Sequence, residues 1–146
     1  MNYEAHLTGA LAAAKKLGLE VWEINVIDRK EIEEKTPAIT AQRAGAIIIE
    51  PDITIADNMD VIVKQSLKEK LPLIPPPTFI GSGGLATYGH DDLSLGQQGA
   101  MLVDKILKGA KPSALPIEQP SKMRLIINLK TAKTIGLKIS KEILLR

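Results

Sequence analysis

Apolar and polar residues alternate along the chain in a way that predicts helices and strands in turn. Apolar residues at helical spacing predict a first helix, and they are Leu7, Leu11, Ala14 and Leu17. Gly18 follows them and predicts the end of this helix. The next stretch, 19–27, is dense in β-branched and apolar residues and predicts a strand. Asp28 then predicts the cap of a short helix that runs through Glu34.

The rest of the pattern continues this order. Pro37 predicts a helical turn that runs to Arg43. Residues 46–49 form a continuous apolar run, which is typical of a buried parallel strand. The later predicted elements are a helix over 57–70, a strand over 71–74, a turn over 81–84, a strand over 85–88, a helix over 93–107, a strand over 125–129 and a small helix that ends at Gly136. Strands separated by helices predict an α/β fold with a Rossmann-like three-layer parallel sheet, and no strand precedes the first helix.

Length and composition fit a single globular domain over residues 1–146. The chain is 45% hydrophobic and 25% charged, which argues against disorder. A net charge of +2 is too small to indicate a nucleic-acid partner, because such binding needs a clustered excess of Lys and Arg. The chain has no cysteine, which excludes disulfides, thiolate chemistry and zinc–thiolate sites.

Targeting segments are not expected in this sequence. No run of apolar residues approaches the roughly 20 needed to span a bilayer. Residues 1–6 lack a basic start and an apolar run, so we expect no signal peptide in this chain.

Two phrases near the C-terminus carry a family resemblance. The first reads KILKG over 105–109 and continues with KP at 111–112, LP at 115–116 and Glu118. The second reads INLKTAK over 127–133 and continues to Gly136. Two long phrases at this separation form a specific signal. They resemble the C-terminal half of bacterial ABC transporter substrate-binding proteins, which have the type I periplasmic binding protein fold.

The resemblance implies one lobe of a two-lobed solute receptor, without the family's usual first strand and with about half of the family's length. It implies a hinge segment over 85–120 that crosses toward the other lobe. Such a receptor traps a small molecule, such as an amino acid or a related solute, between its lobes and presents the closed form to an ABC permease. Family members act in the periplasm or as extracellular lipid-anchored proteins.

Candidate ligand-binding residues follow the predicted strands, because ligands of open α/β sheets sit beyond the carboxyl ends of the strands. Asp52 and Asp91 offer carboxylates for an ammonium group, and Phe79 or Tyr88 offers an aromatic wall. The resemblance adds that Tyr88, Gly89 and Asp91 match a YG-x-D phrase at the family's interlobe cleft. The alternative interpretation is an aspartate that caps a turn and a tyrosine that packs in the fold.

No motif in the sequence requires an enzyme. The glycine-rich stretch 81–84 precedes a predicted strand rather than a helix, so it predicts a turn and not a phosphate-binding loop. His6 and His90 lack partners at metal-ligand spacing, and a Gly-x-Ser-x-Gly motif is absent. We therefore expect no catalytic residue, no metal and no cofactor.

Two other functions stay open from the sequence. The first is an intracellular ligand-sensing or regulatory domain of the same architecture, which needs an N-terminal DNA-binding helix-turn-helix, and none is visible. The second is a small flavodoxin-like nucleotide-binding protein, which needs a phosphate loop after a first strand. An unpaired strand edge and the apolar stripe of the helix over 93–107 also predict that the chain forms a homodimer.

Overall fold

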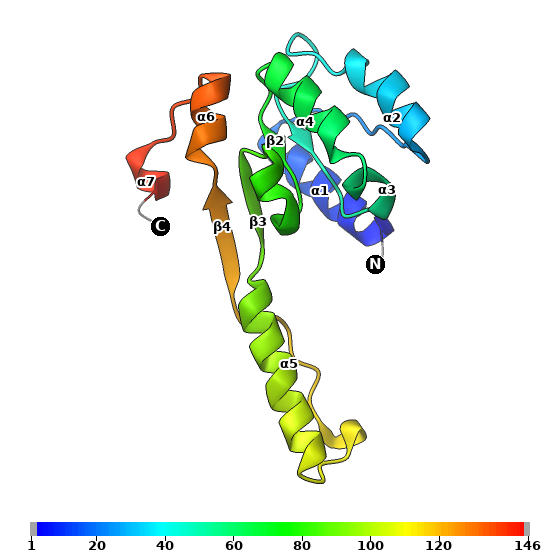
Figure 1. Cartoon of the computed structure of the whole chain (residues 1–146), viewed down its shortest axis with the longest axis vertical. Coiled ribbons are helices and arrows are strands. Elements are labelled where there is room, and N and C mark those ends of the chain that lie inside the picture. Colours follow the sequence, from blue (N-terminus) through cyan, green and yellow to red (C-terminus); the bar gives the residue numbers. More distant parts are fainter. Residues whose placement is uncertain (1–2, 145–146) are drawn as a thin grey trace.

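The computed structural model describes residues 3–144, which form helices and two small sheets (Figure 1). The helices are α1 (Tyr3–Leu17), α2 (Arg29–Lys35), α3 (Ile53–Ala56), α4 (Met59–Lys68), α5 (Asp92–Leu107), α6 (Leu129–Ile135) and α7 (Lys141–Leu144). Short 3-10 helices are η1 (Thr36–Ala38), η2 (Pro77–Ser82) and η3 (Pro112–Ala114). The strands are β1 (Ile47–Ile48), β2 (Leu73–Ile74), β3 (Ala86–His90) and β4 (Met123–Ile127).

Helix ends follow the local chemistry that the sequence predicts. The Asp28 side chain caps α2 and accepts a hydrogen bond from the Glu31 backbone N–H at 2.8 Å. Gly18 follows α1 and has a positive φ of 67°, and Gly136 ends α6 with a φ of 76°. Both conformations belong to the left-handed region, which glycine adopts without steric cost. These predicted boundaries are therefore confirmed.

The four strands pair in two separate ways. β1 and β2 are parallel, with Ile47 opposite Leu73. β3 and β4 are antiparallel, and Gly89 lies opposite Arg124. Leu85 links the two pairs, because its N–H donates to the Leu73 carbonyl at 2.7 Å and its carbonyl accepts from Asn128 N–H at 2.8 Å.

The predicted α/β class is confirmed, but residues 3–144 form two two-stranded sheets rather than the predicted three-layer parallel sheet, and only the β1–β2 pair is parallel. The stretch 19–27 is not a strand, since the backbones of Val21, Trp22 and Ile24 have no backbone hydrogen-bond partner among the described residues. Apolar residues alone do not make a strand, because each ladder position needs a neighbouring backbone. The last two strands are antiparallel because the chain leaves along β3, runs through α5 and returns along β4.

The turn predicted from Pro37 to Arg43 is shorter than expected. It is the 3-10 helix η1, which ends at Ala38, and Ile39 is already extended with a φ of −83° and a ψ of 100°.

The main core lies where α2, α4 and the β1–β2 pair meet. Its buried members are Ile32, Ile47, Met59, Ile62, Leu71 and Leu73. Ile32 and Leu73 are almost fully buried, at 1% and 0% exposure. A second cluster of Leu85, Ala132 and Ile135 packs α6 against the start of β3. The parts of the fold nearest these clusters are therefore the most firmly held.

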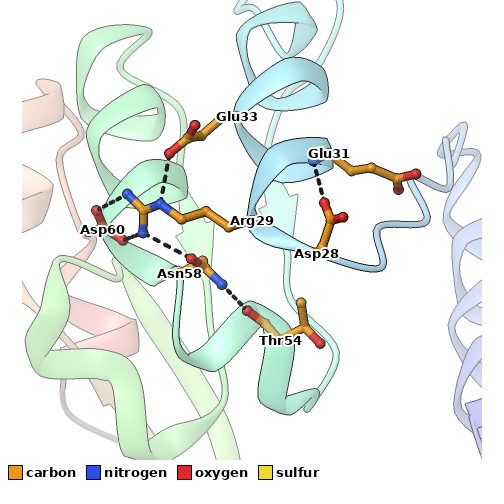
Figure 2. Close-up of polar contacts among 7 residues, drawn as sticks. All are labelled: Asp28, Arg29, Glu31, Glu33, Thr54, Asn58 and Asp60. Atoms are coloured by element: carbon orange, nitrogen blue, oxygen red, sulfur yellow. Dashed lines mark hydrogen bonds and ion pairs between the residues drawn. The ribbon is translucent and has the colours of Figure 1, made fainter.

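A polar cluster joins α2 to the turn between α3 and α4 (Figure 2). The Arg29 guanidinium donates to Asn58 Oδ1 at 2.9 Å and to Asp60 Oδ2 at 3.3 Å, and it pairs with Glu33 at 2.8 Å. Asn58 in turn donates to the Thr54 carbonyl at 2.7 Å. The hydrogen bond from Arg29 lowers the pKa of the Asp60 carboxyl below its ordinary value. Because the charged groups are exposed, this cluster sets the orientation of α2 more than it adds stability.

Helix α5 extends away from the other elements, and the return segment that contains η3 runs beside it (Figure 1). Gln98 holds this return segment, since its amide donates to the Gln119 carbonyl at 3.2 Å and its Oε1 accepts from Ser121 N–H at 2.9 Å. Apolar side chains on α5 remain exposed, and they are Leu93, Leu95, Met101, Val103, Ile106 and Leu107. No helix within residues 3–144 is long and apolar enough to cross a membrane.

Candidate functional site

The four residues predicted to bind ligand lie in different surroundings. Asp52 caps α3, where its Oδ1 accepts from Thr54 N–H at 2.7 Å and from Ile55 N–H at 3.2 Å. Phe79 lies in η2, is partly buried and packs against the main core. The geometry around these two side chains matches the alternative interpretation of a capping aspartate and a packed aromatic residue.

Tyr88 and Asp91 lie on the segment where the chain leaves the body of the fold. Tyr88 is on β3 opposite Leu125, and it is 67% exposed. Asp91 follows β3 and stands at the N-cap position of α5. Its backbone N–H donates to the Lys122 carbonyl at 3.0 Å, which ties the outgoing chain to the returning chain.

A small pocket of about 220 Å³ lies at this crossing. It is lined by Pro77, Gly89, His90, Asp91, Asp92, Arg124 and Ile126. The pocket therefore includes Asp91 from the predicted set, but not Asp52, Phe79 or Tyr88. Small-molecule sites are typically larger, at about 300–1,000 Å³, so this pocket is too small to enclose most small molecules.

Charged side chains meet in this pocket from two strands and a helix. Arg124 Nη1 lies 3.3 Å from Asp91 Oδ1, with the Asp91 side chain largely buried and the Arg124 side chain largely exposed. His90 Nε2 lies 3.2 Å from Asp92 Oδ1, and this contact is an ion pair only when the imidazole is protonated. When the His90 imidazole is neutral, the charged groups that line the pocket are the carboxylates of Asp91 and Asp92 and the guanidinium of Arg124. The pocket can thus bind both a cationic and an anionic group of one small molecule.

Gly89 allows the pocket to form beside η2. A Cβ atom at this position would lie 2.5 Å from Pro77 Cγ, well inside van der Waals contact. Only a residue without a side chain lets β3 approach Pro77 this closely. The glycine of the YG-x-D phrase therefore has a packing role in this chain.

Arg124 is a charged pocket residue that was not among the candidates from the sequence. The predicted strand began at Leu125, two residues too late, whereas β4 begins at Met123. A single arginine within an otherwise apolar strand was the available signal. Its significance depends on the register that places it opposite Gly89.

A second hollow, of about 370 Å³, opens between α6 and α7. Its lining is apolar apart from two lysines, and it is formed by Leu129, Ala132, Lys133, Gly136, Leu137, Lys138, Ile139 and Leu144. It is larger than the pocket at Asp91 but offers no carboxylate, and it contains none of the predicted residues. The charged pocket is therefore the better candidate site.

The glycine-rich stretch 81–84 leads from the end of a 3-10 helix to a strand. Residues 81 and 82 end the 3-10 helix η2, Gly83 turns the chain with a φ of 118°, and the next element is β3, so no helix follows this stretch directly, as predicted. Among the described residues, no three His, Cys, Asp or Glu side chains are grouped as metal ligands. The side chain of His6 lies outside the described part of the structure.

Comparison with known proteins points to one family. The family model described as "ABC transporter substrate binding protein" matches residues 4–146. No curated protein matches the chain.

Solved structures agree with that match. A conserved domain protein from Vibrio cholerae is 25% identical, with a TM-score of 0.84, and the match covers 99% of this chain and 49% of that one. The ABC domain from Streptococcus pneumonia in complex with L-Trp is 30% identical, with a TM-score of 0.84 and coverage of 98% and 48%. The ligand-free, open structure of a substrate binding protein with adhesive properties from Clostridium difficile shares the fold at 21% identity, with a TM-score of 0.76 and coverage of 97% and 48%. The chain thus spans about half the length of each structure that it matches.

Proposed function

This chain belongs to the family of ABC transporter substrate-binding proteins, and from that premise we propose that it forms one ligand-binding lobe and the hinge of a two-lobed solute receptor. The family is non-enzymatic and extracytoplasmic. The proposed ligand is a small molecule such as an amino acid or a related solute, which the receptor delivers to an ABC permease. The streptococcal relative was solved in complex with L-Trp, which supports an amino acid as the ligand class.

The observation that carries this proposal is the charged pocket at the start of α5. It lies where the chain leaves the body along β3 and returns along β4, which is the place expected for a hinge over residues 85–120. Its size fits one wall of a site, and a second wall must come from another part of the receptor. Closure of that second wall over the pocket would bury the ligand and supply contacts that the open form lacks.

The exposed face of α5 supports the same arrangement. Apolar side chains on this helix, including Met101 at 57% and Leu107 at 81% exposure, form a surface of the kind that another protein surface covers. In the proposed receptor, the second lobe covers it. A homodimer formed through the same helix is the alternative occupant.

We expect the isolated chain to bind amino acids too weakly for calorimetry or thermal-shift detection. A bound small molecule normally has 70–90% or more of its surface buried. An open pocket of about 220 Å³ cannot bury that share of a ligand. The measurement is a titration of the 146-residue chain with a panel of small solutes. A specific micromolar ligand would show that the chain is a complete receptor and would overturn the proposal.

We expect Asp91→Ala to weaken ligand binding in a two-lobed receptor by about 1–3 kcal/mol, because a charge-assisted hydrogen bond to the ligand is lost. The receptor is built by joining this chain to the half of the streptococcal protein that it does not cover, and affinity is measured by calorimetry with L-tryptophan. Asp52→Ala is the matched control, since Asp52 serves as the cap of α3 and should leave affinity unchanged. Equal affinity of the Asp91→Ala receptor and its parent would leave Asp91 with a structural role alone.

A further inference from the structure

Arg124 has unused hydrogen-bonding capacity at the rim of the pocket. A guanidinium carries five N–H donors in a fixed fork. Within residues 3–144, the Arg124 side chain makes one hydrogen-bonded ion pair, in which its Nη1 lies 3.3 Å from Asp91 Oδ1. Its side chain is 61% exposed on the pocket side of β4. The remaining donors are therefore available to an anionic group of a ligand, for which arginine is well suited.

The N-terminus of α5 offers a second set of unused donors at the same place. Asp91 occupies the N-cap position, but its side chain accepts no bond from the helix backbone. The backbone N–H groups of Asp92, Leu93 and Ser94 have no acceptor among the described residues. A helix of 16 residues carries a partial positive charge at this end, which favours an anion near its first turn.

We propose that Arg124 and the first turn of α5 bind the carboxylate of an amino-acid ligand, while Asp91 binds its ammonium group. This inference rests on the proposed function and adds Arg124 as the residue that determines the specificity of the site. Asp91 has one oxygen directed to Arg124, and no hydrogen bond to its other oxygen is found within the described residues. The ammonium group of the ligand binds this second oxygen of Asp91. The carboxylate of the ligand binds the Arg124 guanidinium, so each charged group of the ligand lies next to an opposite charge.

The charge balance of the pocket favours a zwitterion over a simple anion. Asp91, Asp92 and Arg124 together carry a net charge of −1 when the His90 imidazole is neutral. A phosphate dianion would meet two carboxylates and one guanidinium, so repulsion would offset much of the attraction. An amino acid brings one positive and one negative group, and each finds an opposite charge. The pocket therefore selects ligands that carry both groups.

The test is an NMR titration of the full 146-residue chain with millimolar L-tryptophan, a range in which weak binding by one wall is detectable. The signals to follow are the Arg124 side-chain Nε–H and the backbone amides of Leu93 and Ser94. Tryptamine, which lacks the carboxylate, and 3-indolepropionate, which lacks the ammonium group, are the matched ligands. We expect L-tryptophan to shift all three signals, tryptamine to shift the Arg124 signal less than L-tryptophan does, and inorganic phosphate to act more weakly than L-tryptophan.

Arg124→Gln should weaken L-tryptophan binding about 10- to 100-fold, since one charge-assisted interaction with the carboxylate is lost, and it should not weaken the binding of tryptamine, which has no carboxylate. The affinity of Arg124→Lys for L-tryptophan should lie between those of the parent and Arg124→Gln, because lysine keeps the positive charge but lacks the paired donors of the guanidinium. Arg43→Gln is the control, since Arg43 lies over the Trp22 ring at 5.4 Å and does not line the pocket.

The possible outcomes separate this inference from the proposed function. If L-tryptophan binds the parent chain and Arg124→Gln equally well, the role of Arg124 is refuted and the receptor function stands. A response to phosphate as strong as that to L-tryptophan would make the pocket a general anion site and would also refute it. If no amino acid of a panel shifts a pocket signal in the isolated chain, the inference is refuted; the proposed function fails only if the two-lobed receptor also binds neither L-tryptophan nor any other amino acid of the panel.

Discussion

Leu73→Ala is expected to lower the free energy of unfolding by about 2–5 kcal/mol, the range for truncating a buried leucine. Leu73 is the first residue of β2 and is fully buried at 0% exposure. It lies opposite Ile47 and belongs to the main core. Alanine would leave a cavity there, and a rigid parallel pair of strands cannot collapse to fill it. Urea unfolding followed by circular dichroism measures the change.

Ile48→Ala is the matched control for this substitution. Ile48 lies on the neighbouring strand β1 but is 69% exposed. Its truncation should change stability by less than about 0.5 kcal/mol, as is usual for surface positions. If the two alanine variants unfolded at the same urea concentration, the core would not be centred on the β1–β2 pair.

Gly83→Ala should destabilise the fold by about 1–3 kcal/mol from backbone strain, with a further contribution from overpacking. Gly83 ends η2 with a φ of 118°, which L-residues rarely adopt. A Cβ atom there would lie 2.6 Å from Val63 Cγ1 on α4. Thermal unfolding of the variant and its parent gives the change in stability.

Gly81→Ala tests whether this effect comes from the specific geometry at Gly83. Gly81 lies in the same turn, has no atom within 4 Å of an added Cβ and does not have a positive φ. We expect it to be neutral or slightly stabilising, because alanine restricts the unfolded chain. Equal losses in the two variants would point to a general intolerance of the turn rather than to strain and close contact at Gly83.

The local elements could be predicted because their signals are local. The cap at Asp28, the glycine that ends α1 and the apolar run that becomes β1 each depend on neighbouring residues. The family could also be predicted, because the two phrases near residues 105–109 and 127–133 are long and ordered. Backbone dihedral preferences and short-range hydrogen bonds act within a few residues, so a sequence window contains them.

The sheet and the site could not be predicted in the same way. The stretch 19–27 has strand composition, but no strand within residues 3–144 pairs with it, and pairing depends on distant backbone groups. Of the four predicted site residues, Asp52 is occupied as a helix cap and Phe79 packs on the core, while Asp91 lines the charged pocket. Residue type alone does not distinguish these surroundings.

The sequence by itself determined the cap at the start of α2, the glycines that follow α1 and α6, which residues are apolar enough for the core, and to which family the chain belongs. The tertiary structure alone decided that β3 and β4 are antiparallel and that Arg124 meets Asp91 across 33 positions of chain. The physical reason is that the path of the chain between two antiparallel strands sets which of their residues lie opposite each other. Here that path runs out along α5 and back, which brings an arginine, an aspartate and an uncapped helix end to one pocket.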